Sequence, residues 1–159
     1  MTNMRVNKLL YFAQVHSLAR SGEPLFSDNF SAWPHGPVIE DIYHEFKSYG
    51  RDPITAVSEG YSQKIFSDKQ IALLLDVERE YRQYSTYGLA DITHKEDPWK
   101  KAWNSPDRVI SMESLKDHAS HLPPLPEFKV PYSSADVTRF HDAEGHLILP
   151  KGYEDILDE

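Results

Sequence analysis

The segment that most constrains this chain is Pro34-His35-Gly36-Pro37, which follows Trp33. Proline fixes the backbone φ angle and glycine adopts conformations that other residues avoid, so the segment predicts a rigid, tight bend. We expect Pro37 to occupy the first position of a helix, where its missing N–H costs nothing. That helix is predicted over residues 38–49, and the preceding residues 25–33 are predicted to be extended, with a short edge strand.

Helical periodicity is clearest in two other regions of the sequence. Apolar residues recur at helical spacing over residues 3–21, with Asn3 as the expected N-cap and Gly22 as the expected stop. Ser67 and Gln70 have the spacing of a capping box, which predicts the start of a further helix. Both regions favour a mainly helical fold.

Three shorter helices are predicted after the capping-box helix. One holds Leu89 and Ile92. Another starts at Asp97, expected as the N-cap with Pro98 in the first helical position, and Ser111 is expected to cap the last. Because helices outnumber strands, the sequence predicts a mainly α-helical α+β fold, a compact helical domain with a short β-hairpin or small sheet.

Composition and charge exclude several classes of function. The formal net charge is −8 and no cluster of Lys and Arg stands out, so we expect no direct nucleic-acid binding. The absence of cysteine excludes disulfides and thiolate catalysis, and it fits a cytoplasmic location. Residues 71–75 form the longest apolar run of note, far short of a membrane span, and no signal peptide is predicted.

The C-terminal part of the chain differs in composition from the rest. Residues 123–159 hold five of the eleven prolines, with eight acidic and three basic residues, a net charge of −5. We therefore predict a domain over residues 1–121 and a proline-rich, acidic extension over residues 122–159, with a possible β-hairpin near residues 137–149. Tyr153 and Asp155 are candidate partner contacts in this extension.

Two polar clusters raise the alternative of a small His-dependent metal hydrolase, the first as candidate metal ligands and the second as a candidate general acid–base pair. The residues with suitable side chains are His141, Asp142, Glu144 and His146 in the extension, and His94, Glu96 and Asp97 beside Trp99. A polar loop explains the first cluster, and helix ends explain the second, with His94 near a favourable helix C-terminus. Nucleophile-elbow and phosphate-binding motifs are absent. We therefore predict no catalytic residues, no metal and no cofactor.

Aromatic residues are the best candidates for partner binding, because they dominate binding energy at protein interfaces. Tyr84 and Tyr87 lie where a helix is expected to end, so at least one of them is expected to be exposed. Trp33 has two interpretations, a large buried anchor or part of a rim on which a partner docks, and His35 lies beside it in the bend. Trp33, His35, Tyr84 and Tyr87 are therefore predicted partner contacts.

Several motifs occur together in an order that resembles a known family. They are Lys8-Leu9-Leu10-Tyr11-Phe12, Pro24-Leu25-Phe26, Ala32-Trp33-x-x-Gly36-Pro37-Val38, Ile42-Tyr43-x-x-Phe46 with Tyr49-Gly50, and Leu89-x-x-Ile92-x-His94-x-x-x-Pro98-Trp99. This ordered set, over about residues 3–118, resembles the Panacea domain, the SocA-like group often described as phage-associated. The residues of its signature here are Gly36, Pro37, Val38, His94 and Trp99, to which we assign a structural role.

The resemblance implies a mostly helical α+β domain that acts as an antitoxin in a toxin–antitoxin system. Such domains neutralise a cognate protein toxin by direct binding, and no catalytic activity is implied. Two alternatives on the same fold are an adaptor that presents a toxin to a Clp-type protease and a phage-associated protein that interacts with a host.

Overall fold

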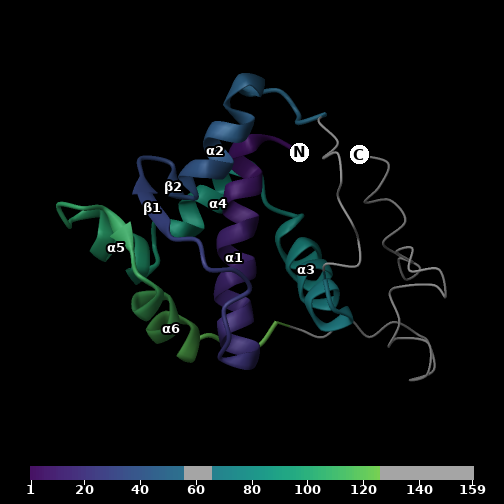
Figure 1. Cartoon of the computed structure of the whole chain (residues 1–159), viewed down its shortest axis with the longest axis vertical. Coiled ribbons are helices and arrows are strands. Elements are labelled where there is room, and N and C mark those ends of the chain that lie inside the picture. Colours follow the sequence, from purple (N-terminus) through teal and green to yellow (C-terminus); the bar gives the residue numbers. More distant parts are fainter. Residues whose placement is uncertain (56–65, 126–159) are drawn as a thin grey trace.

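A computed structural model describes residues 1–55 and 66–125 of the chain (Figure 1). The helices are α1 (Asn3–Ser21), α2 (Glu40–Phe46), the short 3-10 helix η1 (Lys47–Tyr49), α3 (Asp68–Tyr81), α4 (Thr86–Thr93), α5 (Asp97–Trp103) and α6 (Met112–Ser120). The strands are β1 (Phe30–Trp33), β2 (Gly36–Val38) and β3 (Val109–Ile110). The predicted α+β class, mainly α-helical, is confirmed.

Helix α1 runs through the middle of the molecule. Figure 1 shows α3 on one flank of α1, and the sheet with α5 and α6 on the other. The helix packs against α2, α3, α4, α6 and strand β2, so almost every turn of it is covered. Tyr11, Phe12 and Val15 of this helix are buried in the core, and Leu9 and Leu10 are partly buried against it. Most other elements therefore take their position from this one helix.

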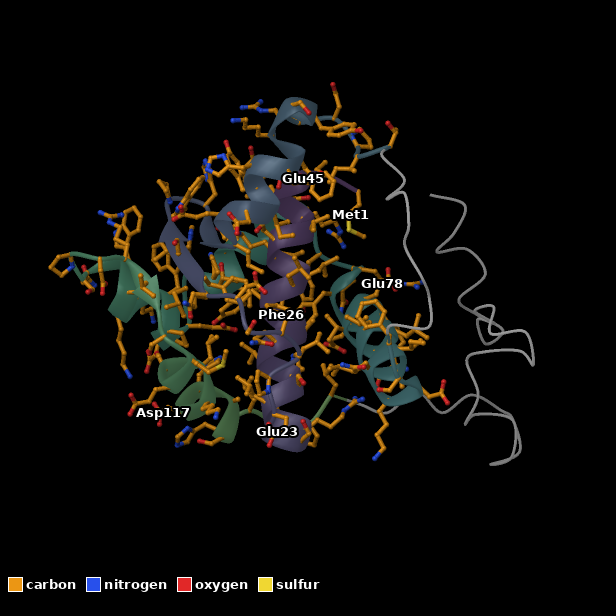
Figure 2. All side chains as sticks on the ribbon, viewed as in Figure 1. Met1, Glu23, Phe26, Glu45, Glu78 and Asp117 are labelled. Carbon is orange, nitrogen blue, oxygen red and sulfur yellow. The ribbon has the colours of Figure 1, made fainter. Side chains whose placement is uncertain are left out.

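Helix α1 also buries polar side chains that hold neighbouring loops. The side chain of Gln14 donates to the carbonyl oxygen of Phe26 at 2.8 Å and accepts from the backbone N–H of Leu25 at 2.8 Å. Phe26 accordingly lies beside the middle of the helix (Figure 2). Ser17 donates to the carbonyl oxygen of Glu23 at 2.9 Å. Because buried polar groups need partners, these bonds fix the path of the chain after α1.

The C-terminal end of α1 agrees with the prediction, and the N-terminal end does not. Gly22 stops the helix in a left-handed conformation, φ 76°, and its N–H bonds to the carbonyl oxygen of Leu18, as expected of a C-terminal glycine. The predicted N-cap, Asn3, is wrong, because Thr2 caps the helix by accepting from the N–H of Arg5. The side chain of Asn3 is instead buried and donates to the carbonyl oxygen of Tyr43 at 2.9 Å.

The sheet has three antiparallel strands in the order β2-β1-β3. Strand β1 is therefore central, and the prediction of an edge strand was wrong. The partner that covers its second edge is β3, a strand of two residues, which is too short to show a periodic pattern in the sequence. Strand β1 occupies the last four residues of the segment predicted to be extended.

The prediction that Pro37 starts a helix was also wrong. Pro37 lies in β2, opposite Ala32, and α2 begins three residues later at Glu40, with Ile39 as the N-cap. An edge strand accepts proline because one side of it has no ladder bond to make. The helix predicted over residues 38–49 is thus shorter, ending at Phe46 and followed by η1.

Side-chain caps begin three of the later helices, and in α4 the cap is Ser85, which accepts from the N–H of Gly88. Ser67 and Gln70 form the predicted capping box of α3, and Ser111 caps α6 by accepting from the N–H of Ser114. For α5 the prediction was wrong, since the N-cap is Glu96 and Asp97 is the first helical residue. The Glu96 carboxylate is engaged elsewhere, as described below, and makes no cap hydrogen bond.

Some predictions lie outside the described residues. They concern the hairpin near residues 137–149, the cluster of His141 to His146, and Tyr153 and Asp155. Within residues 1–55 and 66–125, a helix with the length and apolar character needed to cross a membrane is absent.

Candidate partner-binding surface

The structure brings predicted partner contacts together around the turn between β1 and β2. Trp33 and Gly36 are paired across this hairpin, so Pro34 and His35 form its turn. The rings of His35 and Tyr87 lie edge to face with their centroids 6.3 Å apart. Tyr87 is 59% exposed and Tyr84 is 38% exposed. We call Trp33, Pro34, His35, Tyr84 and Tyr87 the hairpin-turn surface.

Tyr84 and the N-terminal half of α1 are joined by hydrogen bonds. The guanidinium group of Arg5 donates to the carbonyl oxygens of Tyr84 at 2.7 Å and Tyr81 at 3.2 Å. The loop that carries Tyr84 is therefore held against the central helix, although the Tyr84 side chain is exposed. An exposed aromatic residue on a fixed backbone loses little entropy when it binds a partner.

A pocket of about 160 Å³ adjoins the hairpin-turn surface. It is lined by Asn3, Met4, Asn7, Lys8, Trp33, Pro34, His35, Val38, Tyr43, Lys47 and Gly50. Trp33 is half-buried and lies edge to face with Tyr43, with ring centroids 4.7 Å apart. The interpretation of Trp33 as a wholly buried anchor was therefore wrong, because one part of this side chain faces the pocket.

Gly36 allows the hairpin to pack closely on α1 and α4. Its φ is 98°, and a Cβ atom at this position would lie 2.5 Å from Oγ1 of Thr93 and 2.8 Å from Cε of Lys8. A side chain of any size is excluded by these contacts as well as by the positive φ. Glycine is therefore required here for close approach as well as for the turn.

Lys8 is fully buried beneath the hairpin. Its Nζ donates to the carbonyl oxygen of Pro37 at 2.7 Å, and it forms no ion pair with a carboxylate of the described residues. Burial lowers the pKa of Lys8 from its usual 10.5 to about 7. An amine without a counter-charge is costly to bury in its charged form, and this cost lowers the pKa of Lys8.

The side of the hairpin that faces α5 is held by Trp99 and His94. Nε1 of Trp99 donates to the carbonyl oxygen of Trp33 at 3.1 Å, and the His94 ring lies 4.2 Å from that of Trp99. His94 is the C-cap residue of α4, and burial is the main cause of its lowered pKa. Nε2 of His94 is buried without a hydrogen-bond partner among the described residues.

Sequence reasoning missed a partly buried polar cluster between α1, α6 and the residue before α5. The hydroxyl of Tyr11 donates to Oε2 of Glu96 at 2.6 Å, and Nε2 of His118 lies 3.4 Å from the same oxygen. Burial and the neighbouring Glu96 raise the pKa of Tyr11 well above its usual value. Glu96 is thus part of a core cluster that joins α1 to α6, and no sequence signal marks this because the residues lie far apart in the chain.

A metal centre finds no support in the described part of the chain. No group of three or more His, Asp or Glu residues is placed to hold an ion within residues 1–55 and 66–125. The residues of the hydrolase alternative in the C-terminal extension lie beyond that part.

The fold and the surface together define a small, mainly helical α+β domain that exposes aromatic side chains beside a pocket. A family model described as antitoxin SocA-like, Panacea domain, matches residues 6–100. Since this match covers more than half of the chain, the chain belongs to the SocA-like Panacea family.

The chain is also similar to an individual antitoxin. The antitoxin SocA of Caulobacter vibrioides (strain NA1000 / CB15N) is 41% identical over 49 residues, which is 31% of this chain and 26% of the relative. The aligned part thus spans about a quarter of the length of that antitoxin. No solved structure gives a significant match to this chain.

Proposed function

We propose that this protein is an antitoxin that neutralises a cognate protein toxin by direct binding through the hairpin-turn surface. Family membership supports the antitoxin role. The observation that carries the choice of surface is the exposed Tyr87, which contacts the ring of the pocket-lining residue His35, with the exposed Tyr84 three residues earlier in the chain. Exposed aromatic residues next to a concave site are typical of binding hot spots.

The proposed mechanism contains no catalytic step. Trp33 and His35 would form part of the pocket wall, and the two tyrosines would contribute contact area outside the pocket. Gly36, Pro37, Val38, His94 and Trp99 would hold the hairpin in place beneath the partner. Tyr153 and Asp155 of the acidic extension would add contacts that steer a basic toxin, chiefly by raising the association rate. We place this interaction in the cytoplasm, where a chain without cysteine needs no disulfides.

The test is co-expression with a toxic reading frame that neighbours the gene. The wild-type chain should restore growth, and the double variant His35→Ala, Tyr87→Ala should lose this protection while remaining folded. Val109→Ala is the matched control, because Val109 is also exposed, at 42%, but lies on strand β3. Equal protection by the double variant and the control would exclude the hairpin-turn surface.

The same experiment separates direct binding from delivery to a protease. Direct binding should leave the amount of toxin unchanged while its toxicity is suppressed. A fall in the amount of toxin that depends on a Clp-type protease would instead support the adaptor alternative.

A further inference from the structure

The pocket is lined by two lysines and a histidine, although the chain as a whole carries a net charge of −8. Lys8 lies at the floor, Lys47 is exposed at the rim, and His35 belongs to the turn. No Asp or Glu of the described residues lines this pocket. A basic pocket in an acidic protein is a site where charge complementarity selects a negatively charged group.

Other polar groups of the pocket are already bonded within the domain. Asn3 donates to the carbonyl oxygen of Tyr43, and Asn7 donates to Asn3 and accepts from the N–H of Ile39. Lys8 donates one hydrogen bond to the carbonyl oxygen of Pro37. Neither Lys8 nor Lys47 forms an ion pair with a carboxylate of the described residues. The pocket thus retains basic groups whose charge no described acid balances.

The remaining wall is apolar. Met4, Trp33 and Val38 line it, with the ring of Tyr43 edge to face against Trp33. Such a wall suits the methylene groups of a side chain, whereas a bare phosphate group would leave it without contacts. The volume, about 160 Å³, is enough for one side chain and not for a folded element.

We infer that the pocket receives one acidic side chain of the protein partner, with its carboxylate against the amine of Lys47 and close to that of the buried Lys8. This inference rests on the proposed function, since it names the chemistry by which the toxin would be recognised. The aromatic residues of the hairpin-turn surface then contact the partner around this one charged group.

The first test uses the full chain and a pair of matched small probes. N-acetyl-glutamic acid α-amide carries one side-chain carboxylate, and N-acetyl-glutamine α-amide has nearly the same shape without the charge. Titrations followed by amide NMR shifts should show saturable changes at Lys47, His35 and Asn7 with the glutamate probe. The glutamine probe should bind at least about ten-fold more weakly, because a hydrogen bond to a charged group contributes roughly 1.5–3 kcal/mol.

Two variants test whether the pocket lysines bind the glutamate probe. Lys47→Gln should lower the affinity for the glutamate probe to that for the glutamine probe, and Lys47 is exposed, so its replacement leaves the fold intact. Lys116→Gln, at an exposed position on α6, is the matched control and should change nothing. Lys8→Met should also reduce binding, and Lys47→Gln keeps the test decisive if Lys8→Met does not fold.

Three results would overturn the inference. Equal affinity for both probes would show that charge plays no part. Stronger binding of inorganic phosphate at the same resonances would indicate a phosphate site. Shifts in residues 126–159 on addition of the glutamate probe would show that the acidic extension of this chain is the occupant. If growth rescue succeeds in any of these cases, the proposed antitoxin function stands and only the chemistry of the pocket is wrong.

Discussion

The buried amine of Lys8 donates a hydrogen bond to the carbonyl oxygen of Pro37 at 2.7 Å, and this bond ties the central helix to the edge strand of the sheet. This bond explains why Pro37 belongs to a strand and not to a helix. Its missing N–H is not needed at the sheet edge, and its carbonyl group is used by α1.

Replacing Lys8 by Met should change how stability depends on pH. Burial lowers the pKa of Lys8 to about 7 in the folded chain, against about 10.4 in an unfolded one. Between these values the unfolded chain binds more protons, so the Lys8 contribution to the free energy of unfolding rises as pH increases from about 7 to 10. Urea denaturation at pH 7 and pH 9.5 should show wild type gaining stability relative to Lys8→Met. A difference that does not vary with pH would contradict the lowered pKa.

Gly36→Ala should destabilise the fold more than Gly22→Ala does. Both glycines have positive φ, 98° and 76°, so both substitutions carry backbone strain of about 1–2 kcal/mol. Only at Gly36 would the new Cβ atom clash, with Thr93 and Lys8, whereas nothing lies within 4 Å at Gly22. The clash should add about 1–3 kcal/mol, measured as the difference between the two variants in urea denaturation. Equal losses of unfolding free energy in the two variants would show that the hairpin moves to accommodate the new Cβ atom.

Tyr11→Phe should cost about 1–3 kcal/mol, because it removes the buried hydroxyl that donates to Glu96 and leaves this half-buried carboxylate with fewer partners. Tyr84→Phe is the control, since that side chain is exposed and its loss of a hydroxyl should be close to neutral. Thermal or urea unfolding measures both. A neutral Tyr11→Phe would mean that water replaces the hydroxyl.

His16 should remain neutral in the folded chain down to about pH 4. Burial is the largest cause of its lowered pKa, and its Nε2 lies 2.8 Å from the hydroxyl oxygen of Tyr81. Because an unfolded histidine has a pKa near 6.5, the unfolded chain binds the extra proton first, and stability falls as pH drops from about 6.5 to 4. His16→Gln should reduce this fall, while His44→Gln, at an exposed position, should not. An NMR titration of the His16 ring gives the pKa directly.

Local sequence signals predicted the elements that local interactions define. The spacing of apolar residues predicted α1. The capping box of Ser67 and Gln70 predicted the start of α3, and Ser111 predicted the start of α6. The prediction failed at Pro37, whose conformation suits both a helix start and an edge strand. There the choice is made by Ala32 and Lys8, which contact Pro37 only in the folded chain.

The sequence suggested which aromatic residues form the candidate surface, but it did not show which of them lie side by side. Tyr87 and His35 lie 52 positions apart in the sequence, so their contact follows from the packing of α4 against β2. The pocket and the Tyr11–Glu96 pair had no sequence signal at all. A buried Lys8 is also hard to predict, because lysine is almost never fully buried.

The polar residues of α1 have a consequence for local opening of the molecule. Gln14 holds the segment at Leu25 and Phe26, Asn7 holds Ile39, and Lys8 holds Pro37. A loop tied to the core helix cannot detach without exposing that helix to water. The amide of Ile39 should therefore exchange with deuterium only in global unfolding, which would make the hairpin part of the slowest-exchanging unit of the protein and not a fluctuating loop.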